Sequence, residues 1–407
     1  MSTGSILRRQ GKRGASWRLK WELPRDPATG KRSYGYKTVR CQTKKEAAAE
    51  LRKILSSIDA GSYVAPRKQT LRQWLTDWLD HYASKRSPKT FERYGDLLRL
   101  HVMPNLGDMP IQKVTGLDID RLYTKLRTEG RRVKKRTPEG VREVTRGLHE
   151  RTVLHVHRVL SQALSAAVKK RVIERNPAKD ADAPRPNAAR AEVAVSALDR
   201  DQLVALLRGF RDHSLLPLVA LAAGTGARLS ELLALRWSDV DYEQGTVRIE
   251  RALEDTRDGT RIKLPKNKSS RRTIGVDGAL TEILRAYRVR QAEDALTIGI
   301  RLPSDALLFP ESPLSPSVPR RTRNVSKEFG NKAERIGFGH VRFHDLRHTH
   351  ATLLLTAGVP INAVAQRLGH STPVITLSVY GHVLRRAEEQ AAKVAGEILG
   401  PIAAYRP

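Results

Sequence analysis

Two proline-containing tracts without a helical or strand period divide this chain of 407 residues. Residues 61–68 (GSYVAPRK) are punctuated by Gly and Pro, and residues 183–190 (APRPNAAR) hold prolines that forbid a continuous helix. Each proline also biases the residue before it towards an extended backbone. We therefore predict three domains, at residues 1–65, 69–183 and 195–407, each able to bury a core of its own.

In the first part of the chain, apolar residues first alternate as in β-strands and then recur at helical spacing. Residues 16–23 and 33–40 alternate between apolar and polar side chains, and residues 24–31 between them are rich in turn formers. Thr43 can cap a helix, and Glu46 would complete a capping box. The helix would carry an apolar stripe made of Ala47, Leu51, Ile54 and Leu55. We predict a small α+β module, with a β-hairpin or a three-stranded sheet plus one helix.

The middle part is predicted to be helical. Apolar residues recur at helical spacing in four segments, residues 71–82, 87–101, 118–129 and 150–171. Residues 130–147 interrupt this pattern with seven basic residues together with Pro and Gly. Such a composition favours a mobile loop, which either closes on a DNA backbone or is merely solvated.

The third part mixes helices with a short β region. Asp199 can cap a helix, and an apolar helix at residues 215–223 would stop at the glycines of the GTG sequence that follows. In residues 250–277 the pattern of apolar residues changes from helical to β-like. Two β-like runs flank an Asp-Gly turn, and a third lies at residues 272–276. The fold class we predict is therefore multidomain and mainly α, with a mostly α third domain that holds a small antiparallel sheet.

The charge of the chain points to a polyanion as its partner. There are 74 Lys and Arg against 43 Asp and Glu, a formal net charge of +31. Residues 1–65 alone hold 15 basic and 5 acidic residues, which indicates a DNA-binding module rather than a merely solvated basic surface.

The composition also indicates a compartment. The single cysteine, Cys41, can form neither an internal disulfide nor a Cys-based zinc site, so a reducing cytosol fits best. The N-terminus lacks the apolar region of a signal peptide, and the most apolar stretch is about half of the ~20 residues that span a bilayer. We therefore expect neither secretion nor membrane insertion.

Three short clusters hold residues suited to chemistry on a phosphate. Arg228 opens a helix after the glycine break, where free backbone N–H groups also favour an anion, and Glu231 one turn later can orient the guanidinium. His344 and Arg347 are three residues apart, so both can reach one ligand. His344 and His348 have the spacing of helical metal ligands, but the Glu of HExxH is missing, and we expect no metal site.

The third cluster follows a helix end. Gly369 would terminate a helix, His370 comes next, and Tyr380 lies ten residues further on. Taken alone, His370 is more often a satisfied turn residue, and Tyr380 a core aromatic. Their order along the chain after Arg228 and Arg347 changes that interpretation.

The motifs TGARLSELLALRW, HDLRHTHAT and RLGHS occur here in the order and spacing of one enzyme family, followed by Tyr380. The chain resembles the tyrosine recombinases, also called phage-type integrases, and RVIERNPA before the second break is similar to the end of their helical domain. The resemblance covers the whole chain. It implies an arm-type DNA-binding module at residues 1–65, a core-type DNA-binding domain at residues 69–183 and a catalytic domain at residues 195–407.

The resemblance also implies a role for each site residue. Arg228 and Arg347 would clamp the scissile phosphate, while His344 and His370 would add hydrogen bonds and manage protons. Tyr380 would be the nucleophile. A lysine in the turn PKNKSS would protonate the departing 5′ oxygen, and two candidates are Lys266, which we favour, and Lys268.

The implied activity is site-specific recombination between double-stranded DNA attachment sites. It would pass through a 3′-phosphotyrosyl link and a Holliday junction in a homo-tetramer, integrating or excising a phage or mobile element without cofactor or metal. An excisionase and a host DNA-bending protein are possible partners, and the bacterial cytoplasm is the expected location. A type IB topoisomerase, or an architectural DNA-binding protein that keeps the site as a relic, are the alternatives.

The C-terminal tail is the last predicted element. Residues 384–407 can form an amphipathic helix whose apolar side carries Ala387, Ala391, Val394, Ile398 and Leu399. It would pack on its own domain or dock on a neighbouring protomer, and the resemblance favours the neighbour.

Overall fold

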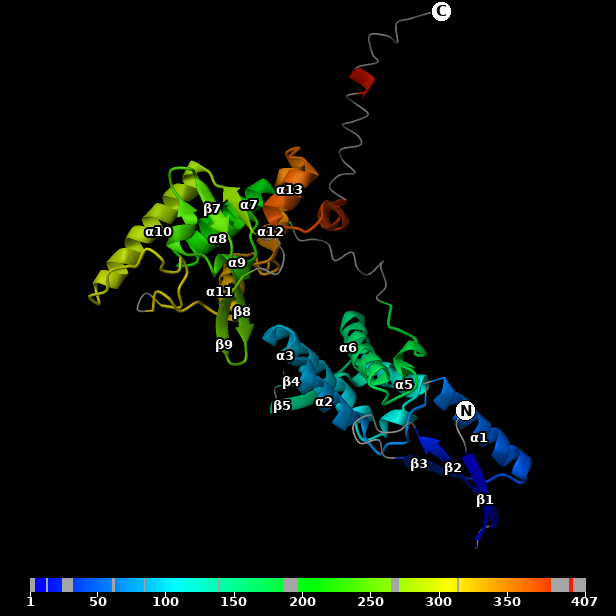
Figure 1. Cartoon of the computed structure of the whole chain (residues 1–407). Coiled ribbons are helices and arrows are strands. Elements are labelled where there is room, and N and C mark those ends of the chain that lie inside the picture. The colour runs from blue at the N-terminus through cyan, green and yellow to red at the C-terminus, as the bar shows by residue number, and fades with distance from the viewer. Residues whose placement is uncertain are drawn as a thin grey trace, which may run out of the picture. The chain divides into compact units, whose positions relative to one another are not determined.

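The chain is mostly helical, with small antiparallel sheets, as the sequence predicts (Figure 1). The computed structural model describes residues 4–11, 14–23, 32–60, 63–83, 85–137, 140–185, 197–264, 271–312, 315–381 and 395–397. The chain divides into two compact units, Met1–Ala191 and Glu192–Pro407. The predicted boundaries of three domains stay a prediction.

The N-terminal part of the first unit is a three-stranded antiparallel sheet with one helix. The strands β1 (Gly4–Gly11), β2 (Gly14–Leu23) and β3 (Ser33–Val39) lie in that order, and α1 (Lys44–Asp59) follows. A small core between sheet and helix is made of Trp17, Leu19, Trp21, Ala47 and Leu51. Of the two predicted forms, the three-stranded sheet is confirmed, while the predicted turn at residues 24–31 lies outside the described residues.

Helix α1 begins where the capping residues predict. The Thr43 hydroxyl accepts the backbone N–H of Glu46 at 3.3 Å. The Glu46 carboxylate reaches back to the backbone N–H of Gln42 at 3.1 Å, one residue before the cap. Two amides at the helix start are thus paired, so the helix begins at a fixed residue.

Helices form most of the rest of the first unit. They are α2 (Leu71–Ala83), α3 (Pro88–Leu97), α4 (Met103–Leu106), α5 (Gly116–Glu129) and α6 (Glu150–Lys169), with a π-helical turn at Leu98–Val102 and 3₁₀ turns at Ile111–Lys113 and Pro177–Lys179. Their apolar faces share one core, in which the indole N–H of Trp74 donates to the carbonyl of Ala163 at 3.0 Å. The four predicted helical segments are confirmed.

The basic tract between α5 and α6 corrects one prediction. It forms an antiparallel hairpin of β4 (Arg131–Thr137) and β5 (Gly140–Arg146), in which Val133 pairs with Val144. We expected a mobile loop because charge, Pro and Gly dominate the composition. Both strands nevertheless contain β-branched residues among their cations, Val133 and Thr137 in β4 and Val141, Val144 and Thr145 in β5, and this β propensity was missed.

The second unit surrounds a short sheet with helices. The strands β6 (Val240–Asp241), β7 (Thr246–Ile249) and β10 (Arg272–Gly275) form an antiparallel sheet in the order β10-β7-β6, while β8 (Ala252–Thr256) and β9 (Gly259–Lys263) form a separate hairpin. The helices are α7 (Arg200–Gly209), α8 (Leu216–Thr225), α9 (Leu229–Leu232), α10 (Gly278–Leu296), α11 (Thr322–Arg335), α12 (Asp345–Thr356) and α13 (Ile361–Leu368), and residues 373–381 are also helical. A 3₁₀ turn spans Trp237–Asp239.

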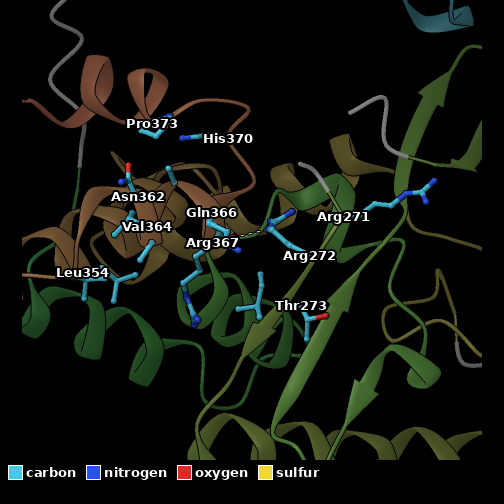
Figure 2. Close-up of a pocket in the computed structure, with 14 residues that line it drawn as sticks. Arg271, Arg272, Thr273, Leu354, Asn362, Val364, Gln366, Arg367, His370 and Pro373 are labelled. Carbon is cyan, nitrogen blue, oxygen red and sulfur yellow. Dashed lines mark hydrogen bonds between the residues drawn. The ribbon is translucent and has the colours of Figure 1, made fainter. Parts of the chain in front are cut away.

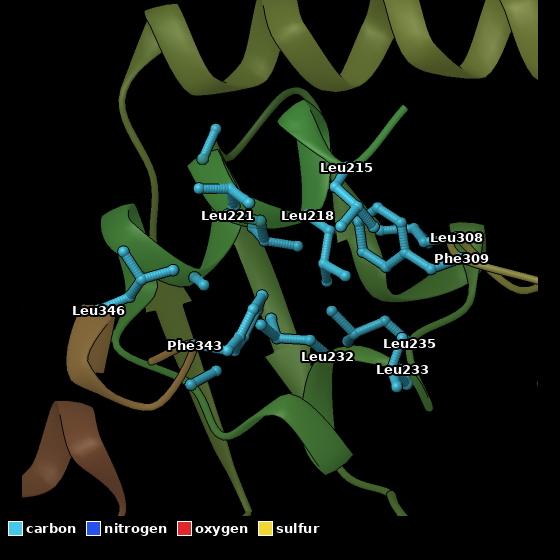
Figure 3. Close-up of a cluster of buried hydrophobic side chains, with 14 of the residues drawn as sticks. Leu215, Leu218, Leu221, Leu232, Leu233, Leu235, Leu308, Phe309, Phe343 and Leu346 are labelled. Atoms are coloured by element: carbon cyan, nitrogen blue, oxygen red, sulfur yellow. The ribbon is translucent and has the colours of Figure 1, made fainter. Parts of the chain in front are cut away.

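The core of the second unit holds α8 in its centre. Leu218 and Leu221 of α8 pack among leucines that follow α9 and near Phe343 and Leu346 at the start of α12 (Figure 3). Helix α8 ends at Gly226 in the left-handed region, with φ +64°. A Cβ there would lie 2.7 Å from the ring of His350, so only glycine fits this close approach of α8 to α12.

The part of the chain that the structure describes contains no helix long and apolar enough to cross a membrane. The C-terminal segment predicted to form an amphipathic helix lies outside the described residues, apart from three helical residues at 395–397. Its predicted docking therefore stays a prediction.

Candidate active site

Arg228 and Glu231 form the first half of the site, at the start of α9. Arg228 is the N-cap residue, and its backbone N–H donates to one Glu231 carboxylate oxygen at 3.0 Å. Its Nη1 donates to the other oxygen at 2.8 Å. The predicted orientation of the Arg228 guanidinium by Glu231 is therefore present. The Arg228 side chain remains 38% exposed, so its other nitrogens can reach a ligand.

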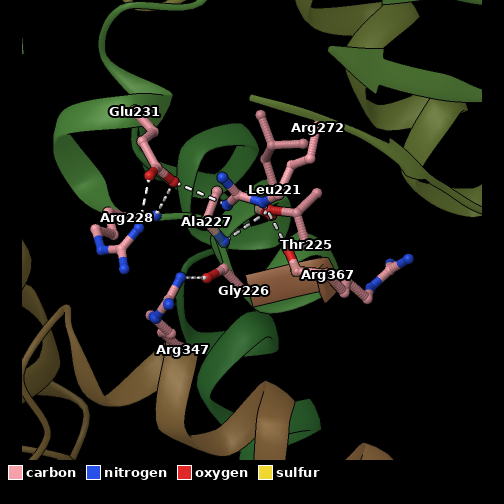
Figure 4. A network of polar contacts seen from close by, with 9 residues as sticks. All are labelled: Leu221, Thr225, Gly226, Ala227, Arg228, Glu231, Arg272, Arg347 and Arg367. Atoms are coloured by element: carbon pink, nitrogen blue, oxygen red, sulfur yellow. Dashed lines mark hydrogen bonds and ion pairs between the residues drawn. The ribbon is translucent and has the colours of Figure 1, made fainter. Parts of the chain in front are cut away.

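Glu231 also holds a second cation that the sequence analysis did not single out. Arg272 of β10 donates from Nη2 to Glu231 at 2.8 Å and from Nε to the carbonyl of Arg367 at 2.7 Å (Figure 4). Burial alone would raise the pKa of Glu231, but Arg272 and Arg228 outweigh it and hold the pKa below its ordinary value. A buried carboxylate thus fixes two guanidinium groups from different elements.

Replacing that carboxylate should destabilise the unit. We expect Glu231→Gln to lower the free energy of unfolding by about 3 kcal/mol, because the buried charge of Arg272 would lose the carboxylate that balances it. Because the folded pKa is lowered, the stability from Glu231 is complete above the ordinary carboxyl pKa and is lost as pH falls through the folded value. Calorimetric unfolding of the full chain should therefore show a gap between wild type and variant at pH 7 that narrows below about pH 4.

The matched control is Glu282→Gln, which removes an ion pair with Arg285 whose side chains are both mostly exposed. That change should alter the unfolding temperature little. Equal unfolding temperatures for Glu231→Gln and wild type at neutral pH would contradict the role given to this carboxylate.

Arg347 of α12 forms the second half of the site. Its Nη1 donates to the carbonyl of Gly226 at 2.7 Å, and the residue is only 4% exposed (Figure 4). Its Nη2 is buried and has no hydrogen-bond partner among the described residues. Burial, with the charge of Arg228 adding to it, lowers the pKa of Arg347 to about 9. A buried guanidinium with an unpaired donor is suited to an anion.

Arg367 joins the elements behind this cation pair. Its Nη2 donates to the carbonyls of Gly224 at the end of α8 and Gly275 of β10, both at 2.9 Å. Its Nε donates to Nε2 of His350 at 3.0 Å, while Nδ1 of that ring lies 2.7 Å from the carbonyl of Ala223. Helices α8, α12 and α13 and strand β10 are thereby held together, and motif spacing did not predict these contacts of Arg367.

The predicted histidines border the two arginines. His344 is the N-cap residue of α12, and burial, with His348 and Arg347 adding to it, lowers its pKa to about 4. His370 follows Gly369, which ends α13 with φ +69°, and its Nδ1 lies 2.7 Å from the Thr376 hydroxyl. Burial and the charges of Arg347 and Arg228 lower the pKa of His370 to about 4 as well. Without a bound anion, both rings are neutral at pH 7.

Tyr380 lies in the helical residues 373–381 and is 1% exposed. Its hydroxyl shares a hydrogen bond of 2.8 Å with Nδ1 of His348. Burial, opposed by Arg347, raises the pKa of Tyr380 to about 12, so the phenol is neutral. The spacing of His344 and His348 suggested only a metal-ligand role for His348, so its contact with Tyr380 was not predicted.

A hollow of about 850 Å³ lies between β10 and α13, beside His370 (Figure 2). Arg272 and Arg367 line it together with Gln366 and Pro373. Among the described residues, no group of three or more His, Cys, Asp or Glu side chains could hold a metal ion.

The structure brings together five of the six predicted site residues. The charges of Arg228 and Arg347 both act on His370, and that of Arg347 acts on Tyr380, while His344 contacts the His348 ring at 5.0 Å between centroids. The sixth, Lys266, and its rival Lys268 lie outside the described residues.

The fold and these motifs match one family. A model of the phage integrase family matches residues 196–386, and a model of the phage integrase N-terminal SAM-like domain matches residues 70–127. A protein named tyrosine recombinase XerC-like from Caldanaerobacter subterraneus is 28% identical over 373 residues, covering 88% of this chain and 90% of that protein. An integrase from Streptomyces ambofaciens is 27% identical over 358 residues, covering 87% of this chain and 86% of its own length.

A solved structure has the same fold. The Tn1549 transposon integrase in complex with a circular intermediate DNA superposes with a TM-score of 0.59 at 21% identity, covering 79% of this chain and 99% of that one. The chain thus shares the fold of that integrase over most of its length. The chain belongs to the phage integrase family of tyrosine recombinases.

Proposed function

We propose that this chain is a site-specific integrase that cuts and rejoins DNA through a phosphotyrosyl intermediate, moving a phage or other mobile element. The observation that carries the proposal is the buried Arg347 guanidinium, whose Nη2 is unpaired among the described residues. The charge of Arg228 acts on Arg347, and the charge of Arg347 acts on the phenol of Tyr380. A phosphodiester would use both features, because its negative charge binds the two guanidinium groups and its phosphorus can be attacked by the phenol.

The two arginines would stabilise the charge that builds up on the phosphate. Within the described part of the chain, Arg228 pairs through Nη1 with Glu231, and Arg347 bonds to Gly226 through Nη1 while its Nη2 has no partner, so both can still donate to a ligand. Both guanidinium groups are fixed before DNA binds, so little reorganisation is needed in the transition state. The neutral rings of His344 and His370 can each donate one N–H to the same phosphate, and its charge would raise their pKa values.

Tyr380 would attack the phosphorus, leaving a 3′-phosphotyrosyl link and a free 5′ hydroxyl. The link conserves the energy of the phosphodiester, so a second strand can rejoin without ATP or metal. We assign protonation of the departing 5′ oxygen to Lys266, with Lys268 as the other candidate.

The N-terminal sheet offers a second DNA-binding surface. On β2, Arg18 lies 4.5 Å over the ring of Tyr36, and the ammonium of Lys20 lies 4.1 Å over the ring of Tyr34. Both tyrosines are more than 40% exposed, while the alternate residues of β2 face the core with α1. A face of cations and aromatic rings suits a DNA backbone, so we assign arm-type sites to this module.

Two binding modules and a catalytic unit fit an assembly that bridges two kinds of DNA site. We place the reaction in a homo-tetramer that passes through a Holliday junction, on chromosomal DNA in the bacterial cytoplasm. An excisionase and a host DNA-bending protein would set its direction, and the C-terminal tail would dock on a neighbouring protomer.

The proposal is tested by strand exchange between a supercoiled plasmid and a linear duplex, both carrying DNA from beside the gene, with host extract to supply bending proteins. We expect joined products whose junctions map to one site. The Arg18→Ala/Lys20→Ala variant should lose joined products yet still cleave a short core duplex.

Two results would overturn the proposal. Relaxation of supercoils without exchange would identify a type IB topoisomerase. Sequence-specific binding with neither relaxation nor exchange would identify an architectural protein.

A further inference from the structure

The hydroxyl of Tyr380 has one hydrogen-bond partner among the described residues, and it is not one of the six predicted site residues. Nδ1 of His348 lies 2.8 Å from Oη of Tyr380, across 32 residues of sequence, and the two rings lie 5.7 Å apart between centroids. His348 is on α12, one residue after Arg347, so the helix that holds the phosphate clamp also holds the nucleophile.

The other imidazoles near the site are engaged elsewhere. Nδ1 of His370 lies 2.7 Å from the Thr376 hydroxyl, and both nitrogens of His350 are used by Ala223 and Arg367. His344 contacts His348 edge to face rather than Tyr380. Among the described residues, His348 is thus the imidazole that reaches the Tyr380 hydroxyl, and in the tautomer with its proton on Nε2 the Nδ1 lone pair accepts the phenolic proton.

The surroundings of His348 favour its neutral form, which can accept a proton. Burial lowers its pKa, as do the charges of Arg347 and Arg342, while the carboxylate of Asp345 opposes them. The lowered pKa favours the neutral ring, and Asp345, which is fully buried at the start of the same helix, would stabilise the imidazolium once formed.

We propose that His348 is a catalytic residue that takes the phenolic proton of Tyr380 during cleavage and returns it during religation. The inference rests on the proposed function and adds a residue to it. In cleavage, the Oη–H bond breaks as Nδ1–H forms, Oη bonds to phosphorus, and the bond from phosphorus to the 5′ oxygen breaks, with Lys266 supplying the proton to that oxygen. In religation each step runs backwards, and the imidazolium protonates the departing tyrosyl oxygen.

The first test compares single-turnover cleavage of a nicked suicide duplex by wild type and His348→Gln in the full chain. Gln keeps a hydrogen-bond acceptor for Tyr380 but cannot hold the proton. We expect covalent complex to form about 100-fold more slowly, with DNA binding unchanged. His340→Gln, which changes an exposed histidine of the same unit, should cleave at the wild-type rate.

The second test separates proton transfer from mere support of the ring. Tyr380 is replaced by 3,5-difluorotyrosine, whose phenol is far more acidic and needs a base less. In the His348→Gln background this analogue should restore cleavage by about 10-fold or more, and in wild type it should give no gain. A structural defect would not respond to the acidity of the phenol.

A third arm uses a duplex with a 5′-bridging sulfur at the scissile phosphate, since a thiolate leaves without a proton. This substrate should rescue Lys266→Ala and leave His348→Gln slow. Wild-type cleavage by His348→Gln, or failure of difluorotyrosine to rescue it, would overturn the inference while the proposed function stands. Loss of the function itself would show separately, as a covalent complex that persists in Tyr380→Phe.

Discussion

Replacing Tyr380 with Phe is expected to abolish covalent attachment to DNA and leave DNA affinity within about twofold of wild type. Phe fills the same buried position, so the fold around residues 373–381 should persist, and only the attacking oxygen is lost. Loss of a nucleophile that no neighbour can replace typically lowers the rate by at least about 10⁴-fold. The measurement is a denaturing gel of protein bound to a nicked suicide duplex, with a native gel on the same DNA.

The matched control is Tyr287→Phe, which removes the hydroxyl of a tyrosine that stacks on Phe309 in the same unit. That variant should form covalent complex at the wild-type rate. Recombination by Tyr380→Phe at the wild-type level would refute the assignment of the nucleophile.

Arg347→Lys is expected to lower cleavage by about 10² to 10³-fold, although the positive charge is kept. One arm of the guanidinium is bonded to the carbonyl of Gly226, which leaves Nη2 for the phosphate. A lysine ammonium is a point charge that cannot hold both positions at once. Single-turnover cleavage, measured at DNA concentrations that saturate each protein, separates this loss from weaker binding.

Arg335→Lys, at an exposed position of α11, provides the comparison and should cleave normally. Cleavage by the Arg347→Lys variant at the wild-type rate would contradict the role proposed for Arg347 in clamping the phosphate. Loss of DNA binding equal to the loss of cleavage would also contradict it, because the clamp is proposed to act on the transition state.

Local signals in the sequence were enough to predict most helices. Thr43 and Asp199 mark helix starts because a side-chain oxygen must pair amides that the helix leaves free, and the structure shows both caps. Gly226 and Gly369 mark helix ends because the left-handed conformation favours glycine. These rules act over a few residues, so a single sequence reveals them.

Long-range pairing is what the sequence could not supply. The β-like period of residues 272–276 predicted a strand, but not that β10 pairs with β7, because register depends on contacts made after folding. The contacts of Arg272 with Glu231 and of His348 with Tyr380 join elements far apart in the chain. The first contact joins β10 to α9 and the second joins α12 to the helical residues 373–381, and motif spacing contains no information on how these elements come together.

The most direct test of the central claim is to isolate the covalent complex, digest it with trypsin and nuclease, and identify the modified residue by mass spectrometry. We predict that the DNA is attached to Tyr380 through the 3′ phosphate of the cleaved strand, with a 5′ hydroxyl on the other product. Attachment to any other residue, or through a 5′ phosphate, would contradict the account.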